Sequence, residues 1–196
     1  LEAIMICLDN SVWMRNGDYQ PTRLQAQNET VNFITRRKID GNQETTVGVL
    51  SMAGHRIDVH VAPCREVGKI MTAVRDEVRI GGTCNFTSAL KTAQLALKNR
   101  PNKNQRQRII VFVGSPVESE QKALVKIGKI FKKNKVAVDV VNFGTENATN
   151  ENAEKLEAFV NAANSSSEGS HLLNVPPGPH ILSDLVLRSS IMVEGG

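Results

Sequence analysis

The sequence has 196 residues, of which 40% are apolar and 22% are charged, and its 24 Lys and Arg against 20 Asp and Glu give a formal net charge of +4. This composition is typical of a globular protein and argues against disorder. The charge is mild for the length, so the sequence does not favour a nucleic-acid partner. No apolar run approaches the roughly 18 residues of a membrane span, and we expect no membrane contact.

The three cysteines, Cys7, Cys64 and Cys84, have no CxxC spacing, which predicts neither a disulfide framework nor a zinc cluster. Together with the lack of a recognisable signal segment, this cysteine usage favours a cytoplasmic and nuclear protein. No repeat or shift in composition divides the chain, so we expect a single domain over residues 1–196.

Short apolar runs alternate with amphipathic stretches along the whole chain. In chain order, we expect a strand at Ala3–Leu8, a helix from Pro21 to about Asp40, strands at Thr46–Met52 and Ile57–Val61, a helix at Arg65–Arg75, a helix through Leu90 and Leu97, a strand at Ile109–Val113, a helix at Ser119–Lys133, a strand at Val136–Phe143, a helix at Glu151–Ala163, a strand at Leu172–Val175 and a helix at Ile181–Leu187.

The order of these elements indicates the fold class. Strands that alternate with helices of ten or more residues predict parallel βαβ units, with helices on both faces of the sheet. In Ile57–Val61 apolar and polar residues alternate after a short turn, which predicts an antiparallel edge strand. The predicted fold is therefore α/β: a doubly wound, mostly parallel sheet of about six strands with one antiparallel edge strand.

In such a sheet, ligands bind outside the carboxyl ends of the parallel strands, here residues 9–18, 81–85, 114–118 and 144–150. These segments contain no glycine-rich phosphate-binding motif, and Ser115 does not lie in a GxSxG nucleophile elbow. The four histidines, His55, His60, His171 and His180, lie away from these segments, which disfavours a Ser-His-Asp arrangement. We expect no catalytic residues and no cofactor.

Three of these segments resemble the ligand-binding end of the von Willebrand factor A-type domain, which has a Rossmann-like fold. The metal-ion-dependent adhesion site of that family uses an Asp-x-Ser-x-Ser motif, a distant Thr and a later Asp. Asp9, Ser11 and Thr83 match this pattern, whereas Trp13 stands for the second serine and Ser115 for the late aspartate. The resemblance covers nearly the whole chain.

The two replacements remove ligands that a hard cation needs. Mg²⁺ requires near-octahedral oxygen ligation, and a single carboxylate offers little charge to offset the loss of its waters. We therefore expect no metal site, with Asp9, Ser11, Thr83 and Ser115 as its remnants. The Asp9 carboxylate is expected to accept hydrogen bonds from loop amides or from Ser11 and Thr83. The alternative is a metal-dependent adhesion domain that binds a protein ligand through Asp9, Ser11 and Thr83.

Longer segments narrow the resemblance within this family. Residues 9–19 (DNSVWMRNGDY), 105–116 (QRQRIIVFVGSP), 161–165 (NAANS) and 176–179 (PPGP) are similar to the N-terminal domain of the multiubiquitin-chain-receptor subunits of the 26S proteasome regulatory particle. The resemblance implies a non-catalytic scaffold that docks the receptor near the lid–base junction, with lid and base subunits as partners. It also implies that ubiquitin chains are captured mainly by C-terminal helical motifs, which are absent from this sequence.

Two groups of residues are candidates for contacts with partners. The loop after the first strand carries the only Trp and Tyr, and its candidates are Asp9, Trp13, Arg15, Asp18 and Tyr19. Trp13 either anchors an interface or fills the vacated metal crevice.

The helix expected at 119–133 carries the second group, a lysine stripe beside its apolar face: Lys122, Lys126, Lys129 and Lys133. The stripe is either a solvated face or a docking surface for an acidic partner, and the lack of interleaved aromatic residues disfavours nucleic acid. The same alternatives apply to a second basic stretch: Arg100, Lys103, Arg106 and Arg108.

Overall fold

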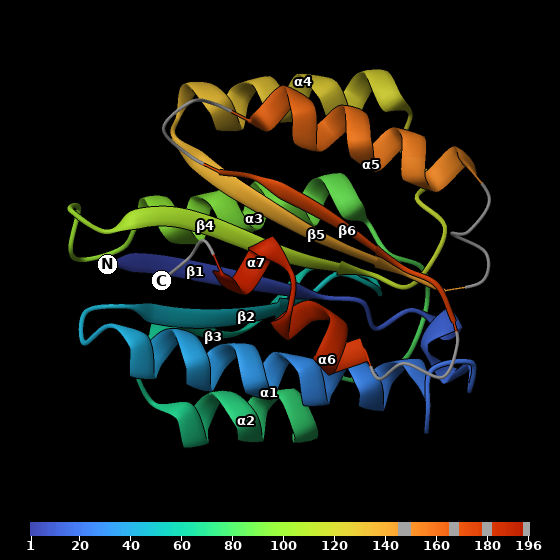
Figure 1. Cartoon of the computed structure of the whole chain (residues 1–196), viewed down its shortest axis with the longest axis horizontal. Coiled ribbons are helices and arrows are strands. Elements are labelled where there is room, and N and C mark those ends of the chain that lie inside the picture. The colour runs from blue at the N-terminus through green and yellow to red at the C-terminus, as the bar shows by residue number, and fades with distance from the viewer. Residues whose placement is uncertain (145–149, 165–168, 178–181, 194–196) are drawn as a thin grey trace.

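The structure is a computed structural model that describes residues 1–144, 150–164, 169–177 and 182–193. Its six-stranded sheet has the order β3-β2-β1-β4-β5-β6 (Figure 1). The strands are β1 (Glu2–Leu8), β2 (Thr46–Ser51), β3 (Asp58–Cys64), β4 (Arg106–Val113), β5 (Val136–Phe143) and β6 (His171–Val175). β3 is antiparallel to β2 and the other neighbouring pairs are parallel, which confirms the predicted α/β class and its antiparallel edge strand.

Helices cover both faces of the sheet, as right-handed crossovers require. One face carries α1 (Arg23–Gly41), α2 (Val67–Asp76), α6 (Leu182–Leu187) and α7 (Ser190–Val193), and the other carries α3 (Phe86–Lys98), α4 (Gln121–Lys133) and α5 (Asn150–Ala163) (Figure 1). A 3-10 helix, η1 (Val12–Arg15), follows β1. Within the described ranges, no helix combines the length and the apolar character needed to cross a bilayer.

Successive residues of β1 contribute to two separate cores. Ile4 and Ile6 pack into the core beneath α1, whereas Ala3, Met5 and Cys7 pack into the core beneath α3, α4 and α5. All of them are fully buried, which explains why this stretch of sequence is apolar at every position. Burial raises the pKa of the Cys7 thiol, so Cys7 behaves as a core residue.

The observed helices differ from expectation in several places, and α2 and α4 each begin two residues later than expected. Pro21 does not open α1, because Thr22 is the capping residue and accepts a hydrogen bond from the Gln25 amide at 3.1 Å. η1 and α7 were not expected, since four residues are too few to show a helical period. His180 lies outside the described residues.

A network of buried charged side chains links four neighbouring strands in the half of the sheet that holds the amino ends of the parallel strands. Arg108 on β4 donates to Glu2 Oε2 at 2.7 Å and to Asp139 Oδ2 at 2.8 Å, and His171 Nδ1 lies 2.8 Å from Asp139 Oδ1. Burial raises the pKa of Glu2, but Arg108 and Lys38 outweigh burial and hold that pKa below its usual value. The prediction that Arg108 belongs to a basic surface is therefore wrong.

The other residues of that basic stretch are used partly within the fold. The Arg100 guanidinium donates to the carbonyls of Leu97, Lys103 and Gln105, at 2.9, 3.1 and 3.0 Å. Arg106 is exposed at the start of β4. The four cations therefore do not form one continuous patch.

Candidate functional site

The carboxylate of Asp9 joins three segments at the carboxyl end of the sheet. Asp9 directly follows β1 and is fully buried. Its Oδ1 accepts hydrogen bonds from the Ser11 amide at 2.9 Å and from the Cys84 thiol at 3.1 Å. Its Oδ2 accepts from the Gly114 amide at 2.9 Å and from the Ser115 hydroxyl at 2.7 Å. One side chain thus links β1, the end of β4 and the loop before α3.

The donors to Asp9 differ in part from those expected. Thr83 is exposed and lines a surface hollow, so the expectation that it donates to Asp9 is wrong. The thiol of Cys84, the next residue, donates to Asp9 instead. Burial and, after it, the negative charge of Asp9 raise the pKa of the Cys84 thiol well above its usual value, so the thiol remains protonated and able to donate.

These residues do not fit a divalent cation. Both oxygens of Asp9 already accept two hydrogen bonds each, and Ser115 adds a hydroxyl donor where the adhesion motif has a second carboxylate. Among the described residues, Ser11 Oγ is buried without a hydrogen-bond partner, but a neutral hydroxyl adds no charge to offset metal dehydration. No group of three or more His, Cys, Asp or Glu in the described ranges is placed to hold a metal ion.

Buried amide side chains hold the same strand end from two other sides. Gln27 of α1 donates to the Asp9 carbonyl at 3.0 Å and accepts from the Asp9 amide at 3.1 Å. Asn10 accepts from the Ala53 amide at 2.7 Å and donates to the Arg79 carbonyl at 2.9 Å. Neither residue is among the site residues predicted from the sequence, because an isolated amide carries no local signal of what it will contact.

A buried arginine fixes the loop after η1 to the end of β4. Arg23 is fully buried, and its guanidinium donates to both oxygens of Asp18, at 2.7 and 2.8 Å, and to the Gly114 carbonyl at 2.7 Å. A Cβ at Gly114 would lie 2.6 Å from Met14 Sδ and 2.9 Å from the Phe143 ring, so no larger residue fits. Asp18, proposed as a partner contact, therefore has an internal role as the counter-ion of Arg23.

Tyr19 is also internal, which corrects its assignment as an interaction residue. The side chain is buried, and its ring packs edge-to-face on Phe143 with 5.5 Å between ring centroids. Its hydroxyl donates to the Val175 carbonyl and accepts from the Gly144 amide at 3.0 Å. Tyr19 thus connects the loop to the ends of β5 and β6.

The exposed part of this loop is apolar. Val12 and Trp13 are 46% and 38% exposed, and Arg15 is exposed beside them. Trp13 is therefore partly at the surface, and Met14 is the residue of η1 that is buried in the core. The Val12 amide donates to the Gly82 carbonyl at 3.1 Å, which places η1 beside a hollow of about 480 Å³ lined by residues that include Gly82 and Thr83.

The same hollow contains a serine and a histidine in contact, which the sequence analysis did not expect. Ser51 Oγ at the end of β2 lies 2.8 Å from His60 Nε2 on β3, and Glu77 Oε2 lies 3.6 Å from His60 Nδ1. The expectation that the histidines lie away from the strand ends is wrong for His60, because β3 runs back alongside β2. Ser51 is only 2% exposed and Glu77 lies beyond hydrogen-bond distance, so the contact joins β3 to β2 rather than forming a complete triad.

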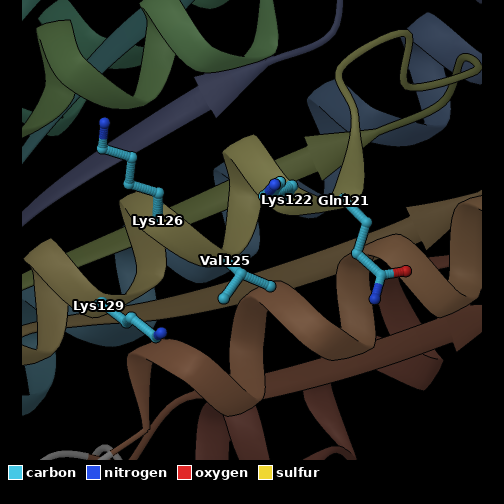
Figure 2. Close-up of a pocket in the computed structure, with 5 residues that line it drawn as sticks. All are labelled: Gln121, Lys122, Val125, Lys126 and Lys129. Carbon is cyan, nitrogen blue, oxygen red and sulfur yellow. The ribbon is translucent and has the colours of Figure 1, made fainter.

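The predicted lysine stripe lies on the outer face of α4. Lys122, Lys126, Lys129 and Lys133 are exposed, whereas Leu124, Ile127 and Phe131 are buried on the opposite face. Figure 2 shows Val125 pointing towards α5, and Lys126 extending to the other side of α4. α4 lies on the outer side of the sheet (Figure 1), and none of these lysines contacts the Asp9 carboxylate.

Known proteins have similar sequences and the same fold. Residues 4–117 match the von Willebrand factor type A domain. The chain is 52% identical to a 26S proteasome non-ATPase regulatory subunit 4 homolog from Arabidopsis thaliana, over 97% of this chain and 49% of that protein. It is 43% identical to the 26S proteasome regulatory subunit RPN10 of Saccharomyces cerevisiae, over 100% of this chain and 72% of that protein.

The solved structures lead to the same family. The crystal structure of the SpRpn10 VWA domain superimposes with a TM-score of 0.89 at 43% identity, and the match covers 97% of this chain and 96% of that one. BatB from Bacteroides thetaiotaomicron, at 16% identity and a TM-score of 0.74, shares the fold alone. The chain spans about half the length of the first curated relatives that it matches, 49%, 54% and 48% of them. On these grounds the chain belongs to the von Willebrand factor type A domains and, among them, to the Rpn10 (non-ATPase regulatory subunit 4) family of 26S proteasome subunits.

Proposed function

We propose that this chain is a non-catalytic docking domain that anchors a ubiquitin receptor in the 26S regulatory particle, near the junction of lid and base. Its partners are lid and base subunits, and ubiquitin chains bind mainly through helical motifs elsewhere in the receptor. The domain works in the cytoplasm and the nucleus. The names of the relatives, all proteasome regulatory subunits, support this assignment.

The observation that carries the proposal is the closed hydrogen-bond network around Asp9. All four contacts of its carboxylate come from within the chain, so the site is built to hold its own loops in place. The loops held in this way present Val12 and Trp13, two partly exposed apolar side chains on a short helix anchored by Met14. Aromatic anchors on a preorganised backbone are typical of protein interfaces, because little conformational entropy is lost when they bind.

The metal-dependent alternative has less support. Binding of a protein ligand through Asp9, Ser11 and Thr83 requires a cation that all three residues hold, yet Thr83 is exposed at the rim and both oxygens of Asp9 are occupied by internal donors. Docking through Val12, Trp13 and Arg15 needs no metal.

Co-purification tests the proposal. The tagged chain is incubated with a cell extract that contains intact proteasomes, and the retained proteins are identified by mass spectrometry. We expect lid and base subunits with the wild type, and at least about tenfold less with Trp13→Ala combined with Val12→Ser, which removes a central anchor. The matched control is Phe33→Ala on α1, where an apolar side chain is 44% exposed outside this surface.

Two results would contradict the proposal. If the wild-type chain recovers no proteasome subunits from such an extract, the chain is not a docking domain. If the wild type recovers them and the double variant does so equally well, the docking surface is not the one formed by Val12 and Trp13.

A further inference from the structure

The outer face of α4 is a second candidate docking surface, because it combines exposed lysines with partly exposed apolar side chains. Leu124, Ile127 and Phe131 fix the rotation of the helix about its axis by packing into the core. A Cβ on Gly128 would lie 2.7 Å from the Phe159 carbonyl and 2.8 Å from Ala162 Cβ, so α4 and α5 are in close backbone contact there. The backbone positions from which the side chains of the opposite face extend are consequently fixed.

This face carries positive charge and no negative charge. α4 contains five lysines, Lys122, Lys126, Lys129, Lys132 and Lys133, and no Asp or Glu, and all five lysines are exposed. Lys122 and Lys126, like Lys129 and Lys133, are four residues apart, a spacing at which like charges repel on a helix. Among the described residues, no ion pair within 4.0 Å neutralises any of the five. No ion pair among the described residues therefore relieves the repulsion within this surface.

Apolar groups lie among these ammonium groups. A shallow hollow of about 640 Å³ runs along α4, lined by Gln121, Lys122, Val125, Lys126 and Lys129 (Figure 2). Ile130, which is 41% exposed, lies outside this hollow, on the other side of the lysine stripe from Val125. The surface thus offers apolar contact area bordered by cations at helical spacing.

We propose that the outer face of α4 docks an acidic amphipathic helix of another protein. Carboxylates one turn apart on such a helix match the spacing of the lysines, and its apolar residues cover Val125 in the hollow. Nucleic acid fits less well, because the α4 face offers neither arginine nor an exposed aromatic residue for stacking. The proposal does not rest on docking through Val12 and Trp13, since the two surfaces share no residue.

The test uses two synthetic helical peptides as probes, one with glutamates at helical spacing around two leucines and one with glutamine in place of every glutamate. Binding to the chain is measured by fluorescence anisotropy, and the contact surface is mapped from amide chemical shifts. We expect the glutamate peptide alone to bind, with shifts centred on α4 and an affinity that falls as salt is raised.

Two variants with equal net charge distinguish binding at the α4 face from attraction by the net charge of the whole chain. Exchanging Lys122, Lys126, Lys129 and Lys133 for Glu should weaken binding about tenfold or more. Exchanging four exposed cations outside α4, Arg37, Lys91, Lys98 and Arg106, for Glu should weaken it less than about threefold. A third variant with Gln at the four α4 positions removes the charge without adding repulsion, and circular dichroism confirms that each variant is folded.

Three results would overturn the proposal. Equal weakening by the two Glu variants means that net charge alone attracts the peptide. Equal binding of the glutamine peptide means that the lysines do not select an acidic partner. Tighter binding of a single-stranded oligonucleotide of matched charge, again lost in the α4 variants, means that this face serves nucleic acid instead.

Discussion

Replacing Asp9 by alanine tests how the loops at the carboxyl end of the sheet are held. The change leaves four buried donors without their acceptor: the Ser11 and Gly114 amides, the Ser115 hydroxyl and the Cys84 thiol. A buried donor left unpaired costs about 1–3 kcal/mol, and the two backbone amides cannot rotate to find another partner. Removal of a buried charge offsets part of this cost. We expect a loss of about 3 kcal/mol, or roughly 6–12 °C in Tm for a domain of this size.

The assay combines thermal melts followed by circular dichroism with the proteasome pull-down. Asp9→Ala should remain folded, because the sheet core does not contain the Asp9 side chain. The amount of proteasome recovered in the pull-down should fall by a larger factor than the loss of stability alone explains, because the loops of Val12 and Trp13 are no longer held in place. Asp9→Asn keeps one acceptor oxygen and should lose about half as much stability. Asp40→Ala, at an exposed position on α1, is the control and should melt within about 1 °C of the wild type.

A clear result would refute this reasoning. Suppose that Asp9→Ala melts like the control and recovers as much proteasome in the pull-down as the wild type. The four hydrogen bonds then contribute no net stability, and Asp9 is only what is left of a metal site.

Three further predictions follow from other parts of the molecule. Glu2→Gln should lower the free energy of unfolding by about 2 kcal/mol at neutral pH, because Arg108 loses a charged partner. The pKa of Glu2 is lowered in the folded state, so urea titrations should show the difference between variant and wild type shrinking as the pH falls below about 4.3. A difference that stays constant with pH would contradict this prediction. Calorimetric titration with millimolar Mg²⁺ should give only weak, non-saturable heats, and a saturable site lost in Asp9→Ala would show that the donor set does bind metal. A fluorophosphonate probe should leave Ser51 unlabelled despite its contact with His60, and labelling abolished by Ser51→Ala would reveal a reactive serine.

The sequence predicted the architecture well because the strands carry strong local signals. The strand Val136–Phe143 is predicted at its observed boundaries, because six of its eight residues are apolar and Lys135 and Gly144 bracket it. The edge strand was found because polar residues alternate with apolar ones there. The lysine stripe and the buried face of α4 were likewise placed correctly by helical periodicity.

The errors concern residues whose partners are distant in sequence. Tyr19 lies in a polar loop and looks exposed, but the residues that bury it, Phe143 and Val175, belong to strands near the other end of the chain. Arg108 was detectable in principle, because alternation along β4 places it on the same face as Ile110 and Phe112. A buried carboxylate such as Asp139, within an otherwise apolar strand, was the sign that an inward-facing cation existed.

The central position of β1 has a consequence for how this chain is made. β1 is the first strand in the sequence, yet it is flanked by β2 and by β4, which ends at Val113 of 196 residues. At roughly 5–20 residues per second, the ribosome adds the second neighbour some 5–20 s after the first strand has emerged. Throughout that interval one edge of a strand that is apolar from Ala3 to Leu8 lacks its partner, and an unpaired apolar edge favours aggregation. β1 therefore gains its second neighbour only after more than half of these residues have been synthesised.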